Sequence, residues 1–430
     1  MKQYPKYKDS GVSWIGEIPE GWKCTQIRRY LSCVCTGATP PGAAEKYYSN
    51  IGTPWFTPGD FKDFNVLKDS SKYLSEEGND IMKKYPANTI LMIGIGGTMG
   101  KVALSPMECS FNQQINALLT KGEIDNKFVV YYLKIERDNI FNTAKFTTLP
   151  ILNQSETKRI PIVVPSLSEQ HAVVSYLDKK TAQIDRFIAE AEREIEKLNE
   201  LKQAQIAHLV THGLNPDAPM KDSGIAWIEQ IPEHWEVKRI ALLFSENKEK
   251  NVDYEFDHAL KFNYGSLVPK EEKGEVAELK ETYIAYTKIK QNDIAINCLN
   301  LNYDFVSQRV AICPQNGILT SAYLIMTPRK GVNAKYYNFL FKAMDSKKLF
   351  HGMGTGIRLT LSYSELKKQY VVVPPAEEQQ AIVIAINDLS NKIDSLTTDL
   401  TTQIDHLKEL KQRIISDAVT GKIDVREVNN

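Results

Sequence analysis

The glycine-rich stretch GIGGTMGK at 94–101 is the first place in the sequence to look for phosphate chemistry. It does not match a P-loop, because Ile95 stands where the first glycine is required and Val102 replaces the serine or threonine. It also fails the dinucleotide pattern GxGxxG, since Met99 occupies the last position. We therefore expect a glycine-rich hairpin loop, in which glycines permit tight turns or a close approach of the backbone.

Other catalytic patterns are incomplete. FHGMG at 350–354 matches the FxGxG element of adenine methyltransferases, yet it follows an expected helix, and the chain lacks Asn-Pro-Pro-Tyr and Asp-Pro-Pro-Tyr. Glu271-Glu272-Lys273 has no convincing upstream aspartate. The six cysteines include no CxxC pair, which is typical of reduced thiols. We therefore expect no catalytic residue, no cofactor and no metal in this chain.

Composition predicts two or three domains with proper hydrophobic cores, because the 430 residues are 42% hydrophobic and 25% charged. No membrane span or signal peptide is visible, so we expect a cytoplasmic protein. The net charge is zero, but residues 1–165 have 20 basic and 16 acidic side chains, whereas 375–430 have 6 and 10. A polyanion would therefore bind the globular parts, and the more acidic segments would face protein.

Two long stretches, 168–210 and 377–419, have the apolar spacing of coiled-coil helices. A helix rises ~1.5 Å per residue, so the first would be roughly 60 Å long and would need a partner helix. We expect the two to pack antiparallel, with Gln403 breaking the second seam. The residues expected at this interface are Ile184, Ile188, Ile195 and Leu198 in the first helix, and Ile393, Leu396, Leu400, Leu407, Leu410 and Ile414 in the second.

The chain repeats over about half of its length. KDSGVSWIGEIPEGW at 8–22 recurs as KDSGIAWIEQIPEHW at 221–235, and IVVPSLSEQHAVV at 162–174 resembles VVVPPAEEQQAIV at 371–383. This is a tandem duplication. The repeated tryptophans are expected to pack the lead-in onto the rest of each half, as large apolar anchors do.

Each half is expected to be one small α/β (α+β) domain of short strands and a helix. In the first half we expect strands at 89–95, 101–104, 115–119 and 160–164 and a helix at 127–141. The second half should have strands at 293–297, 309–312, 318–326 and 370–373 and a helix at 334–350. The predicted division is 1–165 for the first domain, 166–214 for the central helix, 215–374 for the second domain and 375–430 for the distal helix.

Between the matches the halves diverge. Residues 36–87 and 244–291 show no defensible similarity, and the loops GIGGTMG at 94 and CLNLNYDFVSQ at 298 differ in length and chemistry. Helices that remain similar while the loops diverge indicate that the two halves share one function and differ in another. The natural division is a repeated partner contact and two different ligands.

The framework motifs are the repeated segments at 8–22 and 221–235 and at 162–174 and 371–383. Together with the half-chain repeat, they resemble the DNA specificity subunit of a type I restriction-modification enzyme. The resemblance covers almost the whole chain, although the domain interiors cannot be matched. It implies two target-recognition domains, each reading one half of a bipartite asymmetric site in double-stranded DNA. The paired helices would set the spacer length and dock two methyltransferase subunits, and restriction/translocase subunits would join them. S-adenosylmethionine, ATP and Mg²⁺ would belong to those partners.

The residues expected to contact DNA begin with Lys101 and Arg309, which start matched strands beside the divergent loops. Arginine can read guanine through two hydrogen bonds, whereas lysine more often holds a phosphate. Other donors and acceptors near these loops are Thr98, Gln113, Gln114, Asn300, Asn302, Tyr303 and Gln308. A second surface, the turn before the final strand of each domain, contributes Lys145, Thr147, Thr148, Thr355 and Arg358. For each, the alternative is an exposed side chain without a ligand.

Two other functions remain open from the sequence. A self-sufficient DNA modification enzyme would transfer a methyl group when given S-adenosylmethionine and DNA alone. A coiled-coil scaffold with protein-binding end domains would show no dependence on DNA sequence. Neither explains why the framework repeats while the loops diverge.

Overall fold

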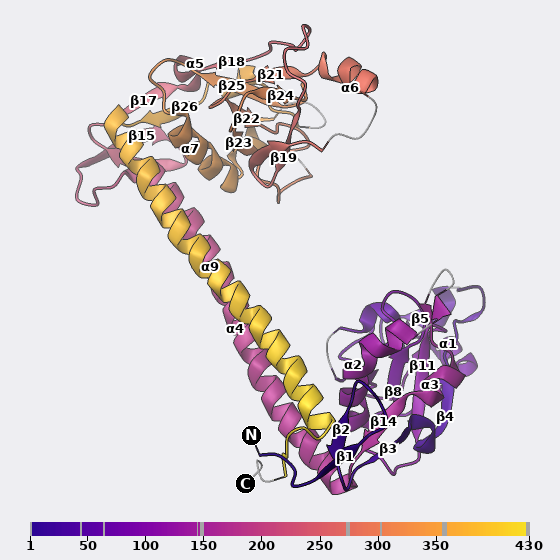
Figure 1. Ribbon diagram of the computed structural model, residues 1–430. Helices are drawn as coiled ribbons and strands as arrows, with labels where there is room; N and C mark the ends of the chain where they lie inside the picture. The colour runs from indigo at the N-terminus through magenta and orange to yellow at the C-terminus, as the bar shows by residue number, and fades with distance from the viewer. Residues whose placement is uncertain are drawn as a thin grey trace. The chain divides into compact units, whose positions relative to one another are not determined.

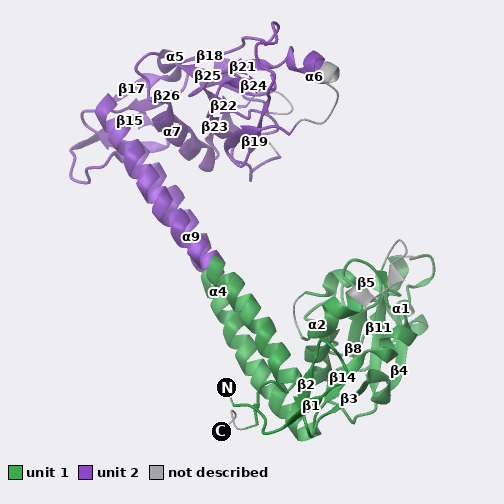
Figure 2. Cartoon of the chain, viewed as in Figure 1, with its two compact units in different colours: residues 1–191, 402–430 green, residues 192–401 purple. Residues whose placement is uncertain are grey.

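The computed structural model describes residues 2–43, 45–62, 65–143, 145–146, 150–271, 276–301, 303–354 and 359–426. The chain separates into two compact units, residues 1–191 with 402–430 and residues 192–401 (Figure 2). Each unit holds one α/β domain and a segment of both long helices. This division cuts through each helix, whereas the sequence predicted each helix as a segment of its own.

The domain of unit 1 is organised around an antiparallel four-stranded sheet, ordered β4-β11-β8-β9. A second four-stranded sheet has the order β10-β6-β7-β5, and smaller pairs join β1 to β2, β3 to β14 and β12 to β13. The strands of the first sheet are β4 (Leu31–Thr36), β8 (Ile90–Ile93), β9 (Val102–Leu104) and β11 (Ile115–Thr120). Those of the second are β5 (Tyr48–Ser49), β6 (Thr53–Phe56), β7 (Tyr73–Leu74) and β10 (Ser110–Phe111).

The remaining elements of this domain lie around the two sheets, with α2 against β9 and α3 against β4 (Figure 1). The short strands are β1 (Tyr7–Asp9), β2 (Glu17–Pro19), β3 (Lys23–Gln26), β12 (Lys145–Phe146), β13 (Pro150–Ile151) and β14 (Pro161–Val164). The helices are α1 (Glu76–Ile81), α2 (Asn126–Thr143) and α3 (Gln154–Arg159). The core is shared, because Phe128 and Tyr132 of α2 lie in one hydrophobic cluster with residues of both long helices.

The domain of unit 2 repeats the first of these two sheets. Its four-stranded sheet is ordered β18-β25-β22-β23, and β17 pairs with β26 as β3 pairs with β14. The sheet strands are β18 (Phe244–Glu246), β22 (Ile294–Ile296), β23 (Val310–Ile312) and β25 (Leu324–Pro328). The equal strand order in both units confirms the duplication seen in the sequence.

The second domain completes its fold with short elements. The strands are β15 (Met220–Ile225), β16 (Ile228–Pro232), β17 (Glu236–Arg239), β19 (Leu260–Asn263), β20 (Ser266–Pro269), β21 (Thr287–Ile289), β24 (Gly317–Leu319) and β26 (Tyr370–Val373). The helices are α5 (Ile240–Leu243), α6 (Val276–Tyr283), α7 (Ala334–Ser346) and α8 (Tyr363–Leu366). The prediction of a single strand at 318–326 is wrong. A turn divides this segment between β24 and β25, and in that turn the Tyr323 amide donates to the carbonyl of Thr320.

The long helices are α4 (Leu167–His212) and α9 (Ala376–Val419). Ser166 and Glu169 form a reciprocal cap at the start of α4, with the Ser166 amide donating to the Glu169 carboxylate at 3.3 Å. Gly213 follows α4 with a φ of 78°, a left-handed conformation that favours glycine and ends the helix. No helix in the described residues is long and apolar enough to cross a membrane.

Within each unit the segments of α4 and α9 lie side by side (Figure 2). In unit 1 the Lys411 ammonium is 2.7 Å from Asp185, and in unit 2 the Lys202 ammonium is 2.8 Å from Asp394. Within unit 1, Glu169 of α4 lies 3.9 Å from Arg426, so the partner number falls from 426 to 411 as the α4 number rises from 169 to 185. Within unit 2, Gly213 after α4 faces Glu378 of α9, so the partner number again falls from 394 to 378. The segments of α4 and α9 are therefore antiparallel in each unit.

Burial at the helix interface corrects part of the predicted seam. Ile184, Ile393 and Ile414 are buried, and the half-buried positions are Ile188, Ile195, Leu198, Leu400 and Leu407. Leu396 and Leu410 are 51% and 45% exposed, so their assignment to the interface is wrong.

Counting in alternate steps of four and three from Ile393 explains the difference. The seam passes through Thr397, Ile404 and Lys411, which are less exposed than the two leucines. Ile404 is 5% exposed, so the predicted break at Gln403 is absent. A strict heptad repeat outweighs the greater hydrophobicity of a leucine one residue away.

The repeated tryptophans are structural, as predicted. Trp22 is buried, and its indole N–H donates to Glu169 at 3.4 Å. Trp235 is equally buried, and its indole N–H donates to Glu378 at 3.0 Å. These contacts tie the lead-in of each domain to the first turn of a long helix, which explains why both motifs recur together.

The two ends of the described chain meet in unit 1. The amide of Asp424 donates to the carbonyl of Lys2 at 2.9 Å, and the Tyr7 hydroxyl donates to the carbonyl of Gly421 at 3.2 Å. In unit 2 the corresponding place is occupied by the continuous chain that links α4 to β15.

Candidate nucleic-acid interface

The loop at 94–100 is a hairpin between the antiparallel strands β8 and β9, as the sequence predicted. Thr98 is half-buried, and its carbonyl accepts the Lys101 amide at 3.2 Å. The Lys101 ammonium donates to the carbonyl of Phe61 at 3.2 Å. Gly100 has a φ of 81°, and a Cβ there would lie 3.0 Å from Cγ of Arg137. Glycine therefore lets this hairpin close against α2.

The two glutamines predicted in unit 1 lie at the turn that precedes β11. Gln113 is exposed, and its side-chain oxygen accepts from the Thr39 hydroxyl at 2.5 Å. The Gln114 side-chain oxygen accepts from the side-chain Nδ2 of Asn112 at 3.1 Å. The structure brings these glutamines to the surface, and their contact with DNA stays a prediction. Lys145 lies in β12, its side chain is not described, and Thr147 and Thr148 lie outside the described residues.

Arg309 of unit 2 is buried, contrary to the prediction that it contacts DNA. Its side chain is 0% exposed, so the predicted contact of its guanidinium with DNA is wrong. The guanidinium instead donates to the backbone carbonyls of Asn297, Leu299, Asn300 and Asp304, at 3.1, 2.7, 3.4 and 2.8 Å. Five donors on a rigid fork suit this task, because each carbonyl of an irregular loop requires a partner when it is buried. Arg309 therefore holds the divergent loop from the inside.

The loop that Arg309 holds presents its side chains to solvent. Asn300 is exposed at a φ of 52°, and Tyr303 is 80% exposed. Gln308 is exposed and lies so close to Gly265 that a Cβ there would clash with its side-chain oxygen. This close approach places the loop beside the tip of the β19–β20 hairpin. Asn302, Thr355 and Arg358 lie outside the described residues.

Sequence reasoning missed the apolar members of this surface. Val306 is 93% exposed, Phe305 is 55% exposed and stacks on His351 with ring centroids 4.7 Å apart, and Tyr264 of the hairpin tip is 94% exposed. Apolar and aromatic side chains contact thymine methyl groups and base faces. The presence of Phe305 and Val306 in CLNLNYDFVSQ was a usable signal, but a search for charged and amide groups passes over it.

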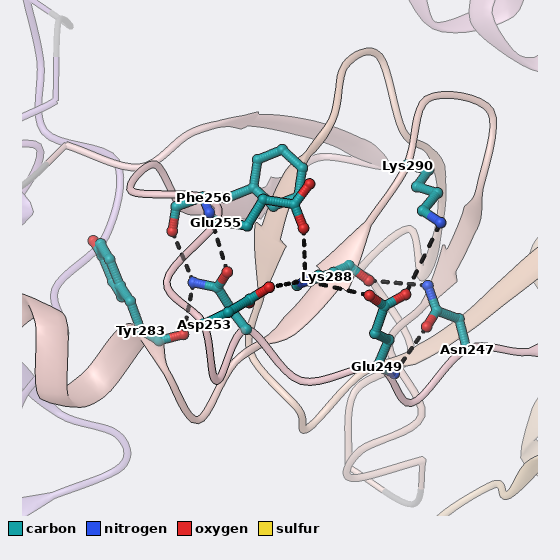
Figure 3. Close-up of polar contacts among 9 residues, drawn as sticks. Asn247, Glu249, Asp253, Glu255, Phe256, Tyr283, Lys288 and Lys290 are labelled. Carbon is teal, nitrogen blue, oxygen red and sulfur yellow. Dashed lines mark hydrogen bonds and ion pairs between the residues drawn. The ribbon is translucent and has the colours of Figure 1, made fainter.

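A buried lysine organises a second variable segment of unit 2 (Figure 3). The Lys288 ammonium lies 3.3, 3.0 and 2.6 Å from carboxylate oxygens of Glu249, Asp253 and Glu255. Its hydrogen bonds to Glu255 and Asp253 raise the pKa of Lys288. Lys290 adds a longer contact of 3.9 Å to Glu249. Three carboxylates outnumber the two lysines, so this cluster fixes a loop and does not attract a polyanion.

Each unit has a cleft between its domain helix and the paired long helices. In unit 1 the cleft has a volume of about 660 Å³ and reaches from Gly100 and Lys101 across α2 to both long helices. Its basic lining residues are Lys62, Lys101, Lys134, Arg137, Lys408 and Lys411, against the acidic Asp138 and Asp185. In unit 2 the cleft has a volume of about 530 Å³ and reaches from Val306, Ser307 and Gln308 across α7 to both helices.

Charge in the second cleft is concentrated on three lysines. Lys202, Lys342 and Lys348 line it, against the single carboxylate of Asp345. Burial, followed by the nearby charge of Lys202, lowers the pKa of Lys342. No hydrogen bond or ion pair joins Lys342 to another residue in the described part of the chain. Both clefts border the loops that were singled out from the sequence, so cations and the divergent loop share one surface in each unit.

Nothing in the described ranges suggests nucleophilic or metal chemistry. No group of three or more His, Cys, Asp or Glu side chains there is placed to hold a metal ion. All six cysteines are free thiols, and burial raises the pKa of Cys298 and of Cys313 to about 12. Such thiols remain protonated at neutral pH and are poor nucleophiles.

The comparisons with known proteins agree with this geometry. The family model of the type I restriction modification DNA specificity domain matches residues 21–197 and 232–406. The type I restriction enzyme MjaVIII specificity subunit of Methanocaldococcus jannaschii is 22% identical over 438 residues, with 96% of this chain and 95% of that protein covered.

Two solved structures share the fold. A chain from a study of complex assembly and conformational transition in the type I R-M system has a TM-score of 0.68 at 12% identity, with 94% of this chain and 99% of that chain covered. The HsdS subunit from Thermoanaerobacter tengcongensis has a TM-score of 0.51 at 14% identity, with 94% and 98% covered.

The family model covers both halves and well over half of the chain. The chain therefore belongs to the type I restriction-modification DNA specificity family. Its function is sequence-specific DNA recognition within such a system, as the resemblance of its framework motifs implied. A protein scaffold and a self-sufficient modification enzyme are not favoured.

Proposed function

We propose that each α/β domain is a target-recognition domain that reads one half of a bipartite, asymmetric DNA site. The observation that carries this proposal is the contrast between a repeated framework and unlike loops. The strand order and the tryptophan–glutamate contact recur in both units, while the loops at 94–100 and 298–308 differ in length and side chains. Two readers on one scaffold would recognise two different half-sites.

The proposal extends to the long helices, which would form an antiparallel coiled coil that sets the distance between half-sites. The shared register of the Lys411–Asp185 and Lys202–Asp394 pairs supports it. A lysine at a seam position costs stability but selects one register, because only one alignment gives it a carboxylate. Base pairs between the half-sites would then be counted by helix length and would not be read.

The helices would also dock two methyltransferase subunits. Phe187, Leu201, Leu396 and Leu410 are exposed by 58, 48, 51 and 45%, although they are large and apolar. Each directly precedes a seam residue, and an offset of 209 in the sequence relates Phe187 to Leu396 and Leu201 to Leu410. In an antiparallel pair these flanks face each other, so each unit would present one apolar pair to a partner.

The docking partner would be a protein present in two copies. Two equivalent apolar pairs fit two copies of one partner, and exposed leucine and phenylalanine side chains suit a protein surface better than a phosphate backbone. Catalysis would then reside in the methyltransferase and restriction/translocase subunits, which would use S-adenosylmethionine, ATP and Mg²⁺. The specificity chain would contribute no catalytic group, and the complex would act in the cytoplasm.

Single-molecule methylation mapping tests this function. The full chain is co-expressed with its methyltransferase subunits in a host lacking other methylases, and a host without this chain is the control. We expect methylated adenines in a split, asymmetric motif with a fixed unspecified gap. Methylation that ignores sequence, or that follows one continuous motif, would overturn the proposal.

A further inference from the structure

The two clefts are copies of each other. Residues of the domain helices correspond at an offset of 208, and those of the long helices at an offset of 209. The lining pairs are Tyr131 with Phe339, Lys134 with Lys342, Thr181 with Ser390, Lys411 with Lys202, Gln412 with Gln203, and Ile415 with Ile206. Two of these pairs are lysines in both units.

The equivalent lysines come from different elements and converge on one space. Lys342 on α7 and Lys202 on α4 line the same cleft and interact electrostatically. Lys134 on α2 and Lys411 on α9 line the other. Lys202 and Lys411 are each held by an ion pair between the long helices, with Asp394 and Asp185. The charge of Lys202 still disfavours the charge of Lys342, and an anion in the cleft would stabilise both cations.

We propose that each cleft binds the phosphate backbone of the DNA whose bases the adjoining loop reads. This inference rests on the proposed function of the two domains. Base recognition must differ between the halves, whereas the phosphate backbone is the same along any duplex. The divergent loops therefore suit the bases, and the repeated lysines suit the backbone.

The clefts have the position that this role requires. Gly100 and Lys101 end the hairpin loop of unit 1 and line its cleft, and Val306, Ser307 and Gln308 belong to the exposed loop of unit 2 and line the other. A phosphate held in the cleft would fix the register of the duplex at the point where the loop enters the groove. Lysine suits this task as a compact point charge that carries no sequence information.

The experiment uses the full chain assembled with its methyltransferase subunits. Binding to a fluorescent duplex carrying the mapped site, and to a scrambled duplex, is measured from 50 to 300 mM KCl for the wild type, Lys342→Gln and Lys134→Gln. Lys335→Gln is the matched control, because Lys335 is an exposed lysine on α7 outside the cleft.

We expect each cleft variant to bind both duplexes about 3- to 10-fold more weakly at 100 mM salt. The slope of log affinity against log salt should decrease by about one for each phosphate that the variant no longer neutralises. Lys335→Gln should keep the wild-type slope, and Lys342→Arg should restore it. The mapped half-sites should stay unchanged.

Three results would overturn the inference. One is an unchanged salt slope in a variant whose thermal unfolding matches the wild type. Another is weaker binding of the cognate duplex alone, which would make the lysines base readers. The third is dissociation of methyltransferase from the complex in native mass spectrometry, which would make the cleft a protein-docking site. If the wild-type complex does not distinguish the two duplexes, the proposed function itself fails.

Discussion

Arg309 shows how a side chain beside a variable loop supports recognition without touching the ligand. Its position at the start of a matched strand made it a plausible reader of guanine, but folding turns the guanidinium inward to four loop carbonyls. Lys101, at the equivalent position, donates to a single carbonyl and remains partly exposed. The sequence shows that both are basic, while only packing decides which one faces solvent.

Replacing Arg309 should therefore disturb one reader selectively. Arg309→Met leaves the loop carbonyls without donors and should cost on the order of 3 kcal/mol of unfolding free energy. We expect recognition of the half-site read by unit 2 to disappear while the other half-site is retained. Methylation mapping and urea unfolding check this, with Arg329→Gln, an exposed arginine, as the control. Equal weakening at both half-sites would contradict a local role.

Glu136 on α2 gives a pH-dependent prediction. Its side chain is 2% exposed, and burial raises its pKa to about 7 from 4.5, although the Tyr132 hydroxyl donates to it at 3.2 Å. The folded state thus binds a proton more tightly than the unfolded state, so ionisation lowers stability as the pH rises from 4.5 through 7. Above that window the unfavourable effect is complete.

Removing the charge should remove this pH dependence. Glu136→Gln should raise the free energy of unfolding by about 1–3 kcal/mol at pH 8, and the gain should shrink toward zero near pH 4.5. Urea unfolding of wild type and variant at pH 5, 6, 7 and 8 measures it. Glu123→Gln, at an exposed glutamate of unit 1, is the control. A gain that is constant with pH would contradict the assignment.

At the scale of elements, periodicity predicted more than propensity did. The long helices and the main strands stand within a few residues of their expected bounds, because a heptad repeat and a buried strand each impose a pattern on many positions. The seam was partly misplaced, since Leu396 and Leu410 are more hydrophobic than the Thr397 and Lys411 that occupy it. The geometry of the paired helices decides which of two adjacent residues lies in the seam, and the sequence of one helix alone does not contain that information.

The candidate interface was less predictable for the same reason. Sequence divergence located the loops, and the structure brings Gln308, Asn300 and Tyr303 to one exposed surface. The clefts were out of reach, because their lysines come from helices far apart in the chain. Lys134 and Lys411, for example, line one space only after the long helices pair.

The corrected seam can be tested by one pair of substitutions on α9. Ile404→Ala removes a buried side chain and should lower the free energy of unfolding by about 2–4 kcal/mol. Leu396→Ala should change it by less than about 0.5 kcal/mol, because that leucine is half exposed. Leu396→Ala should instead weaken methyltransferase binding, measured by titration of the purified subunits. A large loss of unfolding free energy in Leu396→Ala, with little change in Ile404→Ala, would place Leu396 in the seam.

At the scale of the whole molecule, the helices should act as a ruler. In the register of the Lys202–Asp394 pair, Lys197 lies level with Asp399. Matched insertions of seven residues at these two points preserve the heptad repeat and lengthen α4 and α9 by ~10 Å, or about three base pairs. We expect methylation mapping to show a longer spacer and unchanged half-sites.

A four-residue insertion near Lys197 alone provides the comparison. It adds about one turn, or ~6 Å, to α4 and should also alter the spacer, with some decrease in stability because the seam no longer matches. Altered half-sites with an unchanged spacer, in either variant, would rule out the ruler.

The hydrogen bond between Asp424 and Lys2 brings the two ends of the described chain together within unit 1. The equivalent place in unit 2 is covalently continuous, because the chain itself links α4 to β15. A permuted gene that joins residues 424 and 2 and opens the segment between α4 and β15 is therefore expected to encode the same two units.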